Sequence, residues 1–239
     1  MLYSRELSFD MKIEPIAYYH TALKGKFGIP RQSGLVSELR GRVVFEPGYR
    51  NADALRGIDG FDYLWLIWGF SLNGKPCGEW SPMVRPPLLG GNEHMGVFAT
   101  RSPFRPNPLG LSSVKLLGVD NGADGLVLHV AGADLADGTP IFDIKPYVEY
   151  ADAHTAVRSG FVDSNSWQML EVVFPDELRA MFNDDDLRAL IKILELDPRP
   201  QYHNDPERLY GMPYGDNDVR FTVSGNVLTV VEIGNISVE

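Results

Sequence analysis

The stretch Phe61-Asp-Tyr-Leu-Trp-Leu-Ile-Trp-Gly-Phe70 decides the fold class. It is dominated by aromatic and β-branched residues, which favour extended strands. Its apolar run continues from Tyr63 to Trp68 without a polar interruption. A short, continuous apolar run of this kind predicts a strand that is buried on both faces.

Shorter apolar runs lie on either side of this stretch, and Gly, Pro or charged residues bound them. They cover residues 13–19, 41–45, 114–119 and 126–131, and Asp120-Asn-Gly-Ala-Asp-Gly125 between the last two is a turn. No Gly-rich loop opens a helix after a strand, so the dinucleotide-binding βαβ signature is absent. The sequence therefore predicts a mainly β fold, either a barrel or a sandwich.

The pattern changes after residue 152. Pro175-Asp-Glu-Leu begins a helix, and a second helix has an apolar face at i, i+3, i+4 and i+7, formed by Leu187, Leu190, Ile191 and Leu194. Asp197-Pro198 ends that helix, and residues 219–223 and 227–233 form a hairpin. We expect a β domain over residues 10–152 and a small α+β domain over residues 153–239.

Composition narrows the class of protein further. The 239-residue chain is 44% hydrophobic, so it can bury a core, and it has no apolar run of membrane-spanning length. Its single cysteine, Cys77, rules out an internal disulfide and a cysteine zinc cluster. With no leader-like start, this predicts a cytoplasmic protein. Most of the net charge of −10 falls after residue 152, which leaves room for a basic surface on the first domain.

The run Gly96-Val-Phe-Ala-Thr-Arg-Ser-Pro-Phe-Arg-Pro-Asn-Pro-Leu-Gly-Leu-Ser112 has the most informative chemistry. Its three prolines fix the backbone and leave the loop little freedom. Such a loop either holds Arg101, Arg105 and Asn107 ready for a ligand, or is a rigid structural loop whose arginines pair with neighbouring acids.

That run and four others resemble the TsaA-like (YaeB-type) family. The others are Pro30-Arg-Gln-Ser-Gly34, Pro86-Pro-Leu-Leu-Gly-Gly-Asn92, Asp137-Gly-Thr-Pro-Ile-Phe-Asp-Ile-Lys-Pro-Tyr147, and a tail with Asp197-Pro-Arg-Pro-Gln-Tyr202 and Asp218-Val-Arg-Phe221. The resemblance implies a homodimeric β-barrel that uses S-adenosylmethionine. It also implies a tRNA (adenine-37-N6)-methyltransferase acting on threonylcarbamoyladenosine in the anticodon loop.

The resemblance assigns the methyl donor to a defined set of residues: Pro30, Arg31, Gln32, Ser71, Leu72, Arg101, Leu111, Asp137, Gly138, Thr139 and Pro140. The family commonly has more polar side chains where Ser71 and Leu72 stand. An Arg suits the donor carboxylate, and leucines suit its adenine. Taken alone, Asp137-Gly-Thr-Pro140 also reads as an ordinary turn. Arg105, Asn107 and Lys145 are candidates for substrate contact.

Residues 141–147 alternate as a strand, with Ile141, Asp143 and Lys145 predicted on one face. Asp143, Lys145 and Tyr147 either meet the target nucleotide or form a structural ion pair beside an aromatic residue. Asp143 and Tyr147 are the candidates for a catalytic base, and solvent is the alternative.

Two further function classes compete with the enzyme. One is a non-catalytic module that binds S-adenosylmethionine or another nucleotide and controls a partner. The other, a metal-dependent hydrolase, is disfavoured because the histidines lack ligand spacing, and we expect no metal site. In the tail, Arg199, Arg208 and Arg220 either touch tRNA phosphates or offset the local acids.

Overall fold

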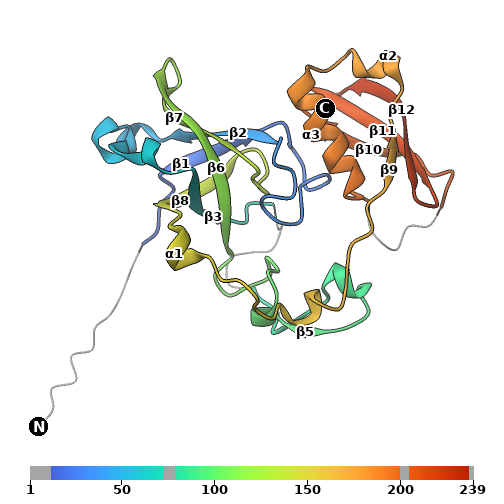
Figure 1. Cartoon of the computed structure of the whole chain (residues 1–239), viewed down its shortest axis with the longest axis horizontal. Coiled ribbons are helices and arrows are strands. Elements are labelled where there is room, and N and C mark those ends of the chain that lie inside the picture. The colour runs from blue at the N-terminus through green and yellow to red at the C-terminus, as the bar shows by residue number, and fades with distance from the viewer. Residues whose placement is uncertain (1–11, 73–78, 200–204, 237–239) are drawn as a thin grey trace, which may run out of the picture.

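The computed structural model describes residues 12–72, 79–199 and 205–236. Six antiparallel strands close into a barrel in the order β1-β2-β7-β6-β3-β8 (Figure 1, left). Their bounds are β1 Ala17–Thr21, β2 Arg40–Phe45, β3 Tyr63–Gly69, β6 Leu109–Gly122, β7 Gly125–Ala131 and β8 Thr139–Pro146. The predicted mainly β fold with a barrel is confirmed, and Cys77 and His203 lie outside the described residues.

β3 lies within the apolar stretch of residues 61–70 and is buried on one face only. Leu64, Leu66 and Trp68 are buried in the barrel, whereas Tyr63 is 45% exposed on the other face. The expectation of burial on both faces was wrong, because within residues 12–72, 79–199 and 205–236 no layer of helices covers the outside of this barrel. Trp68 packs against Gly110, where an added Cβ would lie 2.2 Å from the indole. A glycine is therefore required at that position of β6.

β8 contains a bulge, and the bulge changes which residues share a face. Along β3, Ile67 pairs with Asp143 and the next residue, Trp68, pairs with Ile141, so Phe142 is the extra residue. Ile141 is fully buried, whereas Asp143 and Lys145 lie outside as an ion pair of 2.8 Å. The prediction that Ile141 shares the face of Asp143 was wrong because a bulge breaks the two-residue period.

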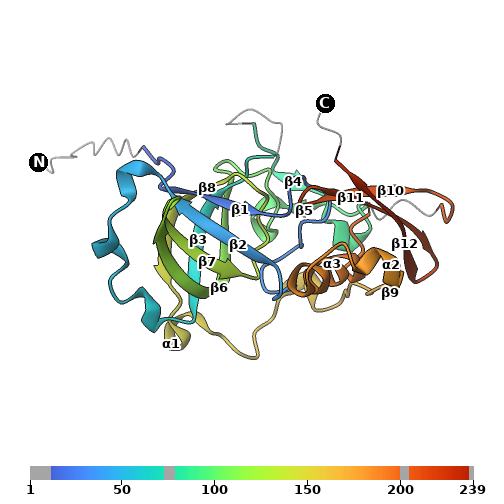
Figure 2. The same cartoon turned by 90° about the horizontal axis from the view of Figure 1, so that it is seen from above.

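The C-terminal unit is a four-stranded sheet with one long helix. The strand order is β10-β11-β12-β9, with bounds β9 Glu171–Val173, β10 Tyr210–Tyr214, β11 Asn217–Ser224 and β12 Val227–Asn235. Helix α3 (Asp184–Glu195) follows the side-chain cap of Asn183, which accepts a bond from Asp186 N–H. Figure 2 shows α3 beside this sheet, to one side of the barrel. The predicted helix and hairpin are both present.

The remaining elements are short. They are α1 (Glu149–Asp152), α2 (Asp176–Arg179), the pair β4 (Met83–Val84) and β5 (Met95–Gly96), and 3-10 turns at Pro47–Tyr49, Ala52–Leu55, Ile58–Gly60, Pro87–Leu89, Val97–Ala99 and Gly160–Val162.

The C-terminal core includes residues from the first half of the chain. Leu23, Val36 and Leu39, from the segment between β1 and β2, are buried in the same cluster as the helix and sheet residues of that unit. Phe27 stacks on Phe221 with ring centroids 6.3 Å apart. The residues that follow β1 therefore tie the barrel to the C-terminal unit, and the boundary at residue 152 stays a sequence-based prediction.

Candidate active site

Three long connections leave the same rim of the barrel. They are the Arg31 loop (residues 22–39, β1 to β2), the insertion loop (residues 70–108, β3 to β6) and the crossover loop (residues 132–138, β7 to β8). Because all neighbouring barrel strands are antiparallel, β1, β3 and β7 end where β2, β6 and β8 begin. The closed topology thus gathers the loops that contain Arg31, Arg101 and Gly138 at one end.

A polar network joins these three loops. A guanidinium nitrogen of Arg101 in the insertion loop donates to Oε1 of Gln32 in the Arg31 loop. In the crossover loop, Asp134 accepts a bond of 2.5 Å from the Ser112 hydroxyl, and that hydroxyl accepts one of 2.9 Å from Trp68 Nε1. Two of the predicted donor residues, Gln32 and Arg101, are therefore brought together.

Asp134 is a further candidate site residue, which the sequence interpretation missed. Burial raises the pKa of its carboxyl group, and this is opposed by the Ser112 hydroxyl, by backbone N–H groups including that of Ser33, and by the charge of Arg101. A desolvated carboxylate at the mouth of a barrel marks a candidate functional site. The signal in the sequence was a single acid among small and apolar residues that are all buried, Ala133, Leu135 and Ala136.

Apolar side chains lie beside the same rim. Leu72 follows the end of β3 and is 36% exposed, and Leu111 on β6 is 58% exposed. A bond of 3.0 Å from Phe70 N–H to the Pro108 carbonyl keeps the end of β3, and hence Ser71 and Leu72, next to the start of β6. Leu111, Ile67 and Asp143 form one row across the outer face of β6, β3 and β8. Two strand spacings separate Leu111 from Asp143, which is about 10 Å.

The polar side chains of the Asp137–Pro140 turn bond to β1 and to the backbone of the crossover loop. Asp137 Oδ1 accepts from Thr21 N–H and lies 3.1 Å from His20 Nδ1, and the buried Thr139 hydroxyl donates to the Ala136 carbonyl at 2.8 Å. Gly138 has φ of +73°, a conformation that favours glycine. Pro140 approaches Gly69. These contacts close the crossover between β7 and β8.

Arg31 points to the C-terminal unit and not to Arg101. Its guanidinium donates to the carbonyls of Leu196 at 2.6 Å and Asp197 at 2.8 Å, just after α3, and lies 3.5 Å above the Trp167 ring. Burial lowers the pKa of Arg31, and the charge of Asp197 opposes that shift. The neighbouring Pro30 is buried. Arg31 and Gln32 therefore bond to different parts of the chain, Arg31 to the residues after α3 and Gln32 to the insertion loop.

The candidate substrate residues fall into two places. Arg105 donates to the Thr100 carbonyl at 2.7 Å and so braces its own loop, while Asn107 is exposed in that loop. Lys145 pairs with Asp143, and Tyr147 packs against Tyr63 and Trp65 at the opposite end of β3. The structure does not bring Tyr147 to the rim of the three loops.

Within the described residues, no three His, Cys, Asp or Glu side chains form a group that would hold a metal ion. In the same part of the chain, no helix is both long enough and apolar enough to cross a membrane.

Comparison with known proteins gives consistent matches over most of the chain. Residues 18–153 match the model of the tRNA-methyltransferase O N-terminal domain, and residues 168–236 match that of the TrmO C-terminal domain. The chain is 37% identical over 223 residues to a tRNA (adenine(37)-N6)-methyltransferase of Escherichia coli (strain K12), covering 90% of this chain and 94% of that one. A relative of the same name from Eikenella corrodens is 44% identical over 164 residues, covering 68% and 91%.

Solved structures agree with the sequence matches. The crystal structure of TrmO from Pseudomonas aeruginosa superimposes with a TM-score of 0.74 at 30% identity, and covers 94% of this chain and 99% of that one. Both halves of the fold are included in that superposition. The chain therefore belongs to the TrmO family.

Proposed function

We propose that this protein is an S-adenosylmethionine-dependent tRNA methyltransferase that methylates N6 of threonylcarbamoyladenosine at nucleotide 37, in the anticodon loop. The relatives named above support the reaction and the nucleotide. A relative from Pseudomonas aeruginosa, 38% identical over 219 residues, is named a putative S-adenosylmethionine-dependent methyltransferase, which supports the donor. The gathering of three loops at one rim, two of them joined by the contact of Gln32 with Arg101, is the structural observation that carries the proposal.

The residues at this rim fit the chemistry of the donor. S-adenosylmethionine supplies a methyl group that its sulfonium already activates, so placement of the reacting atoms can provide most of the catalysis. The exposed guanidinium of Arg101 suits the donor carboxylate, and the exposed Leu72 and Leu111 suit the adenine. The positive charge of Arg101 acts on the carboxyl group of Asp134 and opposes the rise that burial causes in its pKa.

We keep Asp143 as the candidate proton acceptor, because it shares the outer row of Leu111. Its ion pair with Lys145 holds the carboxylate in place on the outside of β8. Tyr147 has less support, because its ring is packed against Tyr63 and Trp65 at the far end of the barrel. Removal of the N6 proton makes that nitrogen a better nucleophile.

Incubation of the purified protein with labelled donor and total tRNA tests the proposal. Label in tRNA, with mass spectrometry of the nucleosides identifying N6-methylated threonylcarbamoyladenosine, is the expected result. A second candidate is a donor-binding module without activity, since a Pyrococcus abyssi relative that is 33% identical over 151 residues is named a probable S-adenosyl-L-methionine-binding protein. Donor binding without label in tRNA would support that module.

We further propose a homodimer and a cytoplasmic location, where tRNA is available. Large apolar side chains exposed on the barrel support the dimer: Tyr63, Leu109, Leu111 and Leu117. Contiguous exposed apolar surface marks interfaces between proteins. Sedimentation equilibrium at the mass of one chain would contradict the dimer.

A further inference from the structure

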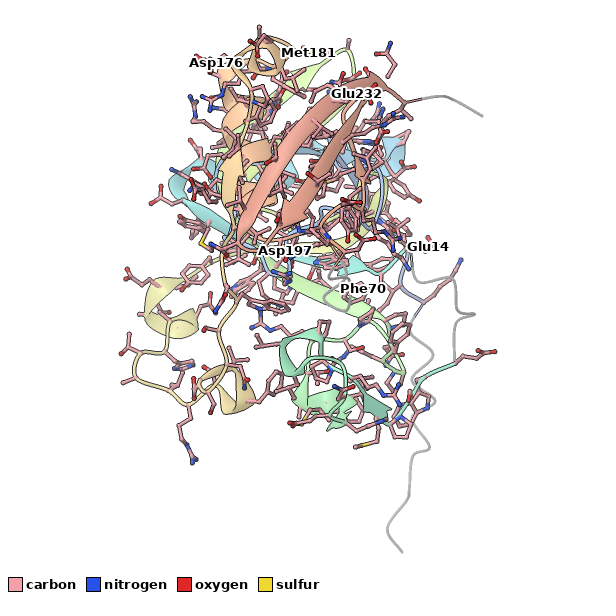
Figure 3. The ribbon with its side chains drawn as sticks, turned by 90° about the vertical axis from the view of Figure 1, so that its right-hand side faces the viewer. Glu14, Phe70, Asp176, Met181, Asp197 and Glu232 are labelled. Carbon is pink, nitrogen blue, oxygen red and sulfur yellow. The ribbon has the colours of Figure 1, made fainter. Side chains whose placement is uncertain are left out.

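A cleft lies where the barrel loops meet the C-terminal unit. Its volume is about 430 Å³, and its walls come from the Arg31 loop, the insertion loop and the residues just after α3. Figure 3 shows Asp197 at this junction, with the C-terminal sheet above it and the loops of the barrel below. The cleft includes Pro30 and Arg31 but not Gln32, Arg101 or Asp134, so it adjoins the network at the rim without containing it.

The charged residues of this cleft are mostly cations. Lys26, Arg31, Arg85 and Arg199 line it, against one acid, Asp197. Arg199 Nε bonds to Asp197 at 2.9 Å, and Arg31 donates to two main-chain carbonyls. Carbonyl groups satisfy hydrogen bonds without neutralising the charge. A local excess of positive charge therefore persists in a chain whose net charge is −10.

Two of the cations are placed to meet a ligand from solvent. Lys26 and Arg85 are exposed, and they face the cleft from different loops. Arg85 Nε donates to His94 Nε2 at 3.0 Å, which leaves its charge uncompensated by that contact. Cations that converge from separate segments on one hollow suit an anion with several oxygens.

We propose that this cleft binds backbone phosphates of the tRNA. The inference rests on the proposed function, and it extends it by giving the RNA a docking site between the barrel and the C-terminal unit. The Arg31 loop contributes to both places, since Arg31 lines the cleft while Gln32 contacts Arg101. RNA held in the cleft thus lies beside the loop assigned to the donor. The positive charge of the cleft allows a chain with a negative net charge to bind RNA, which is a polyanion.

The test measures tRNA binding of the full-length protein by fluorescence anisotropy at several salt concentrations, with Lys26→Ala, Arg85→Ala and the double variant. Log affinity falls as log salt concentration rises, and each lost phosphate contact makes this dependence shallower by about 0.7 to 0.9. Between 50 and 200 mM salt, the wild type therefore loses about tenfold more affinity than the double variant. The control is Arg56→Ala, an exposed arginine paired with Asp53 at the opposite rim, which leaves the slope unchanged.

Donor affinity, measured by calorimetry on the same proteins, distinguishes the sites. We expect it to be the same in the wild type and in the double variant. A double variant with wild-type tRNA affinity and salt slope overturns the inference, as does one that loses donor affinity alone. If Arg85→Ala lowers the melting temperature, the test uses Lys26→Gln in its place. The slope of log tRNA affinity against log salt concentration is then compared between that variant and the wild type. A wild type that binds tRNA but transfers no methyl group would defeat the proposed function and leave this measurement valid.

Discussion

Asp134 and Ser112 are joined by a hydrogen bond of 2.5 Å across the mouth of the barrel, between the crossover loop and β6. Ser112 is 1% exposed, and its hydroxyl also accepts from the buried Trp68. Hydrogen bonds thus connect the carboxyl group of Asp134 to the barrel core, and the charge of Arg101 acts on it from the insertion loop. A buried, satisfied network of this kind holds its members in one arrangement.

Replacing Asp134 with Asn should weaken donor binding by at least about tenfold, because the amide lacks the charge that attracts Arg101. The Asn side chain keeps an oxygen that can accept from Ser112, so the melting temperature should stay at or above that of the wild type. Calorimetric titration with S-adenosylmethionine measures the first effect and thermal melting the second. Asp124→Asn is the matched control, since Asp124 pairs with Arg42 at the other rim. Equal donor affinities of wild type and Asp134→Asn would contradict the role.

The same substitution should change how stability depends on pH. Burial raises the pKa of Asp134 above the ordinary value of about 3.9, so the folded chain binds this proton more readily than the unfolded chain. Its contribution to the free energy of unfolding is present below that ordinary value and is lost as pH rises through the folded pKa. Denaturant unfolding from about pH 4 upward should therefore show the wild type losing stability relative to Asp134→Asn. A constant difference between the two proteins would contradict the shift.

Two arginines of the insertion loop should respond differently to alanine. Arg101 is exposed and contacts Gln32, so Arg101→Ala should abolish methyl transfer and weaken donor binding with little change in melting temperature. Arg105 donates to the Thr100 carbonyl at 2.7 Å, so Arg105→Ala should lower the melting temperature. Thermal melting and donor titration on both variants separate ligand contact from loop bracing. Wild-type donor affinity in Arg101→Ala would remove Arg101 from the site.

Arg31 should matter for stability more than an exposed arginine does. Its two bonds to carbonyls after α3 and its position over Trp167 are lost in Arg31→Ala, which should cost about 2 kcal/mol of unfolding free energy. Arg31→Lys should recover only part of this, because a lysine cannot reproduce the fork of two donors. Urea denaturation measures both variants. A loss no larger than that of the control Arg56→Ala would show that the contacts contribute little.

Asp143→Asn should lower kcat for methyl transfer by about 10²-fold or more, as loss of a general base does, while donor affinity stays unchanged. Lys145→Ala is the paired comparison, because it removes the ion pair and keeps the carboxylate. Steady-state kinetics with threonylcarbamoyladenosine-containing tRNA measure both. An unchanged kcat in Asp143→Asn would assign proton removal to solvent.

The amino-acid sequence by itself determined the local elements. The apolar run of β3, the spacing of leucines along α3 and the turn after β6 each follow from interactions between residues that are close in the chain. The spacing of apolar residues along a strand or a helix reflects these short-range interactions directly. The motifs around Arg31, Arg101 and Gly138 also lie in loops that leave one rim of the barrel.

Only the tertiary structure decided which contacts the residues of those loops and strands make. Arg31 bonds to a carbonyl 165 residues away, and Asp134 meets Ser112 only because the barrel closes. The bulge at Phe142 turned Asp143 to the outer face, against the two-residue period. Contacts between distant segments depend on strand order, barrel closure and register. These arise from the packing of the whole chain, so a short segment of sequence does not predict them.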